Sequence, residues 1–322
     1  LDSAINSPYK DRIIEEYLGK QYGGARALTL PGVHCQSLGN YDSALSDLSR
    51  AYHICLRIDS LTAAAQVGLS LGSIYRELGD YGASEEIYLK TLHFLKNNER
   101  DTEKSRMLGR AYVAMGMLQS EMHNFPLAIS YQHEARIIYE KLSPYHLSNV
   151  FIRLGNIHLK ENSLDSAYDY FKSALTLKEK INSSDGKAEV FNAMGQYHQA
   201  NGATDSALHY YQKALKTSKK SGASLGIMVL NNLGTLSYAK GQYQKSLIFL
   251  RESLYNLDSI KERSLSKVTI LRNIALTYSA LSDFENANKY RWRSEVLRDS
   301  LEQDYRDANN KARAYEETNK RL

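Results

Sequence analysis

The chain has 322 residues, of which 43% are hydrophobic and 24% charged, with 4 prolines and no apolar run near the ~18 residues that a membrane-spanning helix needs. This composition excludes a disordered chain and a membrane-embedded one. The 41 basic and 36 acidic residues are interspersed, so the sequence predicts no basic face of the kind that binds nucleic acid.

Residues 1–24 are predicted to form an N-terminal capping helix. Ser7 and Pro8 have the pattern of an N-cap followed by a first-turn proline, and the helix would run through Tyr22. The chain begins at Leu1 rather than at a methionine. We interpret this start as the removal of a preceding segment, either a signal segment or another boundary, and the sequence does not decide between the two.

Small residues recur at regular intervals through residues 25–300. The first small residue of each repeat follows the previous one by 39 to 44 residues, a second stands 12 residues later, and a third stands 7 residues after that. The first set is Gly32, Gly72, Gly116, Gly155, Gly195, Gly234 and Ala275; the second is Ala44, Ser84, Ala128, Ala167, Ala207, Ser246 and Ala287; the third is Ala51, Thr91, Ala135, Ala174, Ala214, Ser253 and Ser294.

This constant inner spacing predicts helical hairpins, because two helices that meet at one close contact need small residues there, whereas the connections between hairpins can vary in length. Turn signals such as GDY at 79–81 and GQY at 241–243 separate the two helices of a hairpin. The predicted repeats lie near residues 25–64, 65–108, 109–147, 148–187, 188–226, 227–267 and 268–300.

Residues 301–322 are predicted to form a C-terminal helix. Apolar or small residues, with one Asn, follow alternating steps of four and three from Leu301 to Leu322, which is the pattern of a heptad seam. The helix either caps the last repeat or forms a coiled coil with another domain or a second copy of the chain. Because the pattern has no stop signal, we expect the protein to continue beyond residue 322.

The order of small and large residues resembles the tetratricopeptide repeat, most closely in LGSIYRELGDY (71–81), LGNIHLKENSL (154–164) and LGTLSYAKGQY (233–243). The period of about 40 exceeds the usual 34, and it is similar to the longer repeats of kinesin light chains and of bacterial Rap-type and sensor-regulator proteins. The resemblance implies an all-α fold, a right-handed α-solenoid of about seven hairpins, which binds proteins or peptides and is not an enzyme.

No sequence motif points to catalysis, a cofactor or a metal site. Cys35 and Cys55 are predicted to lie too far apart for a disulfide and to remain free thiols. His158 and His198 occupy the same place in successive hairpins that Tyr75 and Tyr278 occupy in others. That regularity indicates a packing role for the histidines rather than metal binding.

A peptide-binding groove is predicted along the exposed face of the first helix of each hairpin. Its residues are Arg76, Arg110, Asn149, Asn156, Asn192, Gln196, Gln199, Asn231, Thr235, Tyr238 and Arg272. Amides both donate and accept hydrogen bonds, so a row of them can hold an extended peptide backbone. The resemblance implies this role for Asn156 in particular, and the arginines could pair with carboxylates. Alternatively, the amides only solvate the groove or satisfy neighbouring helices.

The leading hypothesis is therefore a non-catalytic scaffold that binds a protein or an extended peptide segment, with no nucleic acid, no membrane insertion, and possible self-association through residues 301–322. An alternative is the sensory module of a larger bacterial signalling or transcriptional regulator, which slightly favours an extracytoplasmic location over a cytoplasmic one. A third interpretation is a structural subunit of a larger assembly, whose outer face would expose apolar side chains.

Overall fold

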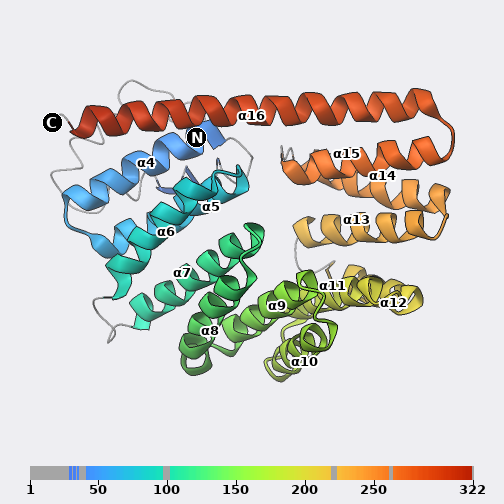
Figure 1. The fold of residues 1–322 in the computed structure, drawn as a ribbon, viewed down its shortest axis with the longest axis horizontal. Coiled ribbons are helices and arrows are strands. Elements are labelled where there is room, and N and C mark those ends of the chain that lie inside the picture. Colours follow the sequence, from blue (N-terminus) through green and yellow to red (C-terminus); the bar gives the residue numbers. More distant parts are fainter. Residues whose placement is uncertain are drawn as a thin grey trace. The chain divides into compact units, whose positions relative to one another are not determined.

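A computed structural model describes residues 29–30, 32–33, 35, 41–96, 102–218, 223–260 and 264–320. Within these ranges the regular elements are α-helices, and no strand occurs (Figure 1). The predicted all-α class is confirmed. The predicted capping helix at residues 1–24 lies outside the described residues, and so does part of the first predicted repeat.

The helices follow one another as hairpins joined by short connections. Their bounds are α4 (Tyr41–Arg57), α5 (Leu61–Glu77), α6 (Tyr81–Lys96), α7 (Thr102–Glu121), α8 (Phe125–Leu142), α9 (Pro144–Lys160), α10 (Leu164–Lys180), α11 (Ser184–Ala200), α12 (Thr204–Ser218), α13 (Ala223–Ala239), α14 (Tyr243–Ser259), α15 (Leu265–Ala280) and α16 (Phe284–Lys320). The odd-numbered helices from α5 to α15 are the first helices of hairpins, and the even-numbered ones are the second helices.

The chain divides into two compact units. Unit 1 comprises Leu1–Leu118 and Glu302–Leu322, and unit 2 comprises Gln119–Leu301. In unit 1, α5 packs against both α4 and α6. In unit 2, each first helix from α9 to α13 packs against its own second helix and against the second helix of the preceding hairpin.

In five repeats the first small residue is a glycine in close contact with the second helix. A Cβ atom added to that glycine would come within 2.3–2.7 Å of a large side chain sixteen positions later, on the second helix. The pairs are Gly32 with Leu48, Gly72 with Tyr88, Gly155 with Phe171, Gly195 with Tyr211 and Gly234 with Leu250. The glycine therefore makes room for the large side chain, and this contact explains the fixed spacing in the sequence.

Each first helix from α5 to α15 ends with the same backbone motif. The residue seven positions after the first small residue has a positive φ, between 59° and 82°, and the next N–H donates to the carbonyl five residues earlier, as in Asp80 to Tyr75 at 2.9 Å. The positive-φ residues are Gly79, His123, Asn162, Gly202, Gly241 and Ser282. This Schellman ending satisfies carbonyls at the helix terminus and turns the chain into the second helix.

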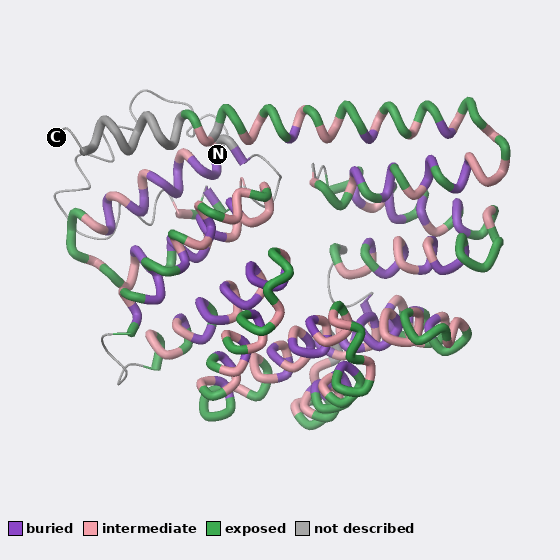
Figure 2. Tube along the Cα trace, in the orientation of Figure 1, coloured by how far each residue is buried: buried purple, intermediate pink, exposed green. Residues whose placement is uncertain are grey.

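Buried residues alternate along each helix with exposed ones, and they lie toward the helix that is packed against it (Figure 2). Aromatic rings extend these contacts at a repeated position. His158 stacks on Tyr170 with ring centroids 5.5 Å apart, and His198 stacks on Tyr210 at 5.0 Å. Tyr278 stacks on Tyr290 in the same way. The two histidines thus pack as the sequence predicted.

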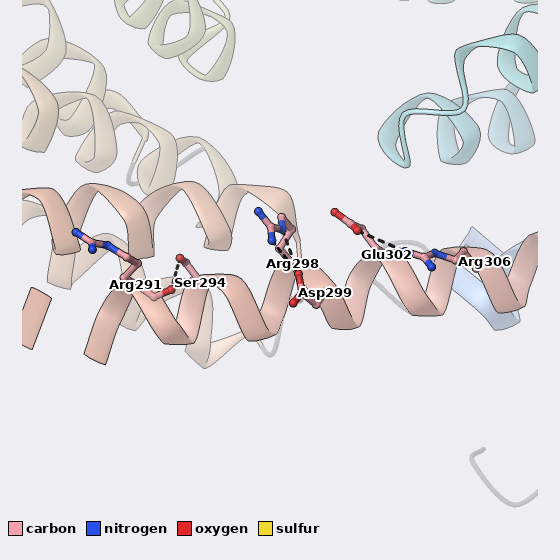
Figure 3. Close-up of polar contacts among 6 residues, drawn as sticks. All are labelled: Arg291, Ser294, Arg298, Asp299, Glu302 and Arg306. Atoms are coloured by element: carbon pink, nitrogen blue, oxygen red, sulfur yellow. Dashed lines mark hydrogen bonds and ion pairs between the residues drawn. The ribbon is translucent and has the colours of Figure 1, made fainter. Parts of the chain in front are cut away.

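The predicted C-terminal helix begins inside α16, which runs without a break for 37 residues. Some of its polar contacts lie within the helix itself, such as Ser294 Oγ to the Arg291 carbonyl at 2.6 Å and Glu302 with Arg306 at 3.7 Å (Figure 3). An exposed ion pair such as that of Glu302 with Arg306 contributes only a few tenths of a kcal/mol. Whether residues 301–322 cap the repeats or form a coiled coil stays a prediction.

Within unit 1, α16 contacts the turn before α6 through Tyr305. The Tyr305 hydroxyl donates to Asp80 Oδ2 at 2.6 Å, and Asp80 Oδ1 accepts from the Ala83 N–H at 3.0 Å. The Asp80 carboxylate therefore accepts one hydrogen bond from the backbone at the start of α6 and one from α16.

The two cysteines are free thiols in the structure. Cys55 is buried, whereas Cys35 is half-buried. Burial raises the pKa of the Cys55 thiol to about 11, so this group is a neutral packing residue at physiological pH. In the part of the chain that the structure describes, no helix has both the length and the apolarity to cross a membrane.

Candidate functional site

Unit 2 contains a cavity of about 620 Å³ formed mainly by the first helices α11, α13 and α15. In Figure 1, α13 lies between α11 and α15. The start of α9 and the end of α14 complete the wall. The lining residues are Tyr145, Gly186, Glu189, Ser224, Leu225, Ile227, Met228, Asn231, Leu257, Ser266, Thr269 and Ile270.

The lining of the cavity combines apolar side chains with several polar ones. The apolar part consists of Leu225, Ile227, Met228, Leu257 and Ile270, of which Met228 is 44% exposed. Hydroxyl and amide groups of Ser224, Asn231, Ser266 and Thr269 add hydrogen-bonding capacity. An apolar pocket with a few placed polar groups is the usual composition of a ligand site, and its volume falls within the ~300–1,000 Å³ typical of such sites.

Two hydrogen bonds between asparagines connect the three first helices around this cavity. Asn232 Nδ2 on α13 donates to Asn192 Oδ1 on α11, and Asn273 Nδ2 on α15 donates to Asn231 Oδ1 on α13, both at 2.9 Å. Asn192 is only 4% exposed. The amides of Asn192 and Asn231, both predicted groove residues, therefore also join neighbouring helices, which is the alternative that the sequence left open.

Other predicted amides also contact the protein itself. Asn149 Oδ1 accepts from Lys178 Nζ at 2.6 Å, and Gln199 Oε1 accepts from the Tyr211 hydroxyl at 2.8 Å. Gln196 is half-buried. Thr235 Oγ1 donates to a backbone carbonyl of its own helix at 2.9 Å.

Asn156 differs from these residues. It is half-buried, and its Oδ1 atom is buried with no hydrogen-bond partner among the described residues. A buried carbonyl oxygen without a donor is costly unless a ligand or a water molecule supplies one. This position is the one for which the family resemblance implies contact with a peptide backbone, and that role stays a prediction.

The remaining predicted residues are more dispersed. Tyr238 on α13 is 37% exposed, and its ring lies 5.4 Å from that of Tyr243. Arg272 on α15 is exposed and does not line the cavity. Arg76 and Arg110 belong to unit 1. Of the eleven predicted residues, Asn231 is thus the one that lines the cavity.

Lys178 was not among the residues predicted from the sequence, and its side chain is fully buried beside the cavity. Its ammonium lies 3.8 Å from the centre of the Tyr145 ring, in addition to its bond with Asn149. Gly186 makes space for the chain, because a Cβ atom there would lie 2.3 Å from Lys178 Cδ.

The repeat spacing could have identified Lys178 as a charged residue at a core position. It stands four residues after the third small residue, a place that other repeats fill with the neutral residues Cys55, Leu95, Tyr139, Ser218 and Leu257, and that the last repeat fills with the half-buried Arg298. A cation at a core position is unusual enough to mark a functional region.

Burial lowers the pKa of the Lys178 ammonium, and the negative charge of Glu189 acts in the opposite direction. A lysine whose pKa is lower in the folded than in the unfolded protein destabilises the fold below the folded-state pKa. The penalty then disappears as the pH rises from that value to the unfolded pKa of ~10.4.

Replacing Lys178 with methionine should therefore stabilise the protein at pH 7 by about 1–2 kcal/mol, because an apolar chain of similar length avoids the desolvation cost. The advantage over the wild type should shrink as the pH rises from neutral toward the unfolded-state pKa of ~10.4. Urea unfolding of both proteins across this range measures it. A constant difference with pH would show that Lys178 does not carry this penalty.

Apolar side chains are also exposed on second helices of unit 2. Ile248 and Tyr255 on α14 are 64% and 73% exposed, and Trp292 on α16 is 64% exposed. This exposure is what the interpretation as a subunit of a larger assembly predicts. Nothing in the structure shows what would cover these residues, so that interpretation stays a prediction.

Comparison with known proteins bears on the fold. Family models described as tetratricopeptide repeat match residues 147–220 and 68–92. The resemblance predicted from the sequence is confirmed in these segments. No curated protein is significantly similar in sequence.

Several solved structures share the fold at low sequence identity. A Rap protein complexed with competence and sporulation factor is 17% identical, with a TM-score of 0.64 and coverage of 92% of this chain and 82% of that one. The Rap conjugation gene regulator of plasmid pLS20, in complex with the Phr* peptide, is 17% identical over 86% and 74%, with a TM-score of 0.61.

A third similar structure is a signal transduction ATPase with a tetratricopeptide repeat sensor, from Pyrococcus horikoshii. It is 17% identical, with a TM-score of 0.57. The match covers 82% of this chain but 39% of that protein. These likenesses establish a helical-repeat fold for this chain.

Proposed function

Because the chain carries tetratricopeptide repeats, we propose that unit 2 binds an extended peptide or protein segment in the cavity between α11, α13 and α15. The observation that carries this proposal is the cavity itself, whose lining combines apolar side chains with hydroxyl and amide groups. The Rap structures with bound peptides support it, because they have the same fold.

The lining suits an extended peptide for a physical reason. A peptide in extended form places alternate side chains on opposite sides and leaves its backbone N–H and C=O groups unsatisfied. Side chains on one side can bury apolar surface against Leu225 and Met228, while the hydroxyls of Ser224 and Ser266 offer hydrogen bonds to the backbone. Thr269 Oγ1 donates to the Leu265 carbonyl at 3.0 Å and can still accept from a peptide N–H. Apolar burial then supplies affinity at roughly 25 cal/mol per Å² before the costs of ordering the peptide.

Met228→Glu tests this site, because it places a charge among the apolar side chains of the lining without disturbing a buried core residue. Random dodecapeptides displayed on phage should be enriched on the wild-type protein, and the selected peptides should bind the variant at least tenfold more weakly, since apolar contact and desolvation are lost. Ile248→Glu is the matched control, because Ile248 is an exposed aliphatic residue outside the cavity.

The control should bind the selected peptides like the wild type, and all three proteins should unfold at similar temperatures. Equal binding by the Met228→Glu variant would remove the cavity from the proposal. Failure of the wild type to enrich any peptide would argue against peptide binding altogether.

A second candidate function is the sensory module of a larger regulator. It is favoured by the likeness to the tetratricopeptide repeat sensor of the P. horikoshii ATPase, in which the similar region is a minor part of the protein. The coding sequence after residue 322 discriminates directly. An apolar run of ~20 residues or an output domain supports this function, and an immediate stop codon contradicts it.

A further inference from the structure

The cavity in unit 2 contains one charged side chain in its lining, that of Glu189. We propose that this carboxylate makes the site selective for a peptide segment in which a basic residue, Lys or Arg, adjoins an aliphatic one. The inference rests on the proposed function, peptide binding in this cavity, and adds the chemistry of the partner.

Glu189 is available to a ligand. The residue is half-buried, and no hydrogen bond or ion pair within the described residues engages its carboxylate. The interaction that the structure does give it is an electrostatic one with Lys178. A half-buried carboxylate in a cavity lined by apolar side chains sits in a lower dielectric than water, so pairing with a cation is strengthened there.

Lys178 does not offer a competing site for an anion. Its side chain has no exposed surface, its ammonium donates to Asn149, and the Tyr145 ring lies against it at 3.8 Å. Tyr145 itself lines the cavity. A ligand therefore meets the Tyr145 ring and the Glu189 carboxylate, and an acidic ligand group would be repelled by Glu189 before it could reach a cation.

The apolar lining of the cavity indicates which kind of residue adjoins the basic one in the bound peptide. Leu225, Met228 and Ile270 come from α13 and α15, whereas Glu189 comes from α11, so the charged and apolar parts occupy different helices of the same cavity. A volume of about 620 Å³ holds a few side chains rather than a folded domain. An extended peptide advances ~3.3 Å per residue, so a basic and an aliphatic residue close together in sequence can occupy both parts.

The experiment is a comparison of peptide selections on the full chain. Phage-displayed random dodecapeptides are selected on the wild type, on Glu189→Gln, on Glu189→Asp and on Glu252→Gln, which removes an exposed carboxylate from α14 outside the cavity. We expect Lys and Arg to be enriched beside Leu, Ile or Met in peptides from the wild type and the last two variants, and this basic enrichment to disappear with Glu189→Gln.

The affinity of a selected peptide then measures how much the Glu189 carboxylate contributes to binding. The peptide's affinity for Glu189→Gln should fall about tenfold, as for loss of a hydrogen bond to a charged group, and an analogue with Gln in place of the basic residue should bind the wild type and Glu189→Gln equally. Peptides that lose binding with Met228→Glu but show no basic enrichment would overturn this inference and leave the proposed function standing. If no peptide is enriched on the wild type, both this inference and the proposed function are contradicted.

Discussion

Replacing Asn149 with leucine should destabilise the protein by about 2–4 kcal/mol at pH 7, because it removes the hydrogen-bond acceptor of a buried ammonium. Lys178 Nζ donates to Asn149 Oδ1 at 2.6 Å, and the lysine side chain has no exposed surface. Without that acceptor, the Lys178 ammonium either keeps its charge in the interior with one hydrogen bond fewer or loses its proton. Neutralisation sets an upper limit, since deprotonating a lysine of pKa ~10.4 at pH 7 costs about 5 kcal/mol.

A double-mutant cycle separates this effect from a general cost of changing Asn149. In the Lys178→Met background there is no ammonium to leave unpaired, so Asn149→Leu should cost less than about 1 kcal/mol. Urea unfolding of the four proteins gives the coupling energy. Asn288→Leu, an exposed asparagine on α16, controls for the added apolar side chain. Equal costs in both backgrounds would refute the role of Asn149 as the partner of the buried charge.

Replacing Gly155 with alanine should destabilise unit 2 by about 1–2 kcal/mol, although alanine is the better helix former. The added Cβ would lie 2.4 Å from Phe171 Cε1 and within 3.0 Å of two more atoms of the ring. Overpacking of this kind costs about 1–3 kcal/mol, and the gain in helix propensity of ~1 kcal/mol offsets only part of it.

Gly226→Ala is the matched control for this prediction. It is also a helical glycine of unit 2, but its added Cβ would meet only Ser218 Oγ at 3.7 Å, an ordinary contact. That variant should be unchanged or more stable by up to ~1 kcal/mol. Hydrogen exchange should locate the loss from Gly155→Ala in α9 and α10. Similar stabilities for the two variants would contradict the close approach of these helices.

The repeat architecture could be predicted because its signal is redundant. Three small residues at fixed intervals recur in seven repeats, because similar helix packing must form again in each hairpin. The glycine facing a large residue sixteen positions later, as Gly195 faces Tyr211, follows from that spacing. The turn positions follow too, because Gly79, Gly202 and Gly241 adopt the left-handed conformation that glycine tolerates best.

The candidate site was predicted less well, because spacing identifies the exposed face of a helix but not its partners. Asn192 and Asn231 are on the first helices as expected, yet each accepts a hydrogen bond from an asparagine in the next hairpin. The spacings of 40 and 42 residues between those partners are close to the repeat period, so these pairs could have been anticipated. The cavity could not, since it depends on which side chains leave space between three helices.

The amino-acid sequence by itself determined the helical hairpins, their turns and the contacts within each hairpin, because these depend on residue intervals along one or two helices. The tertiary structure alone decided that Lys178 lies buried against Tyr145 and Asn149, and that Glu189 shares a cavity with the apolar residues of α13 and α15. Such relations join residues from several hairpins, and they depend on how the hairpins pack and on the volume of each side chain between them, which no periodic pattern records.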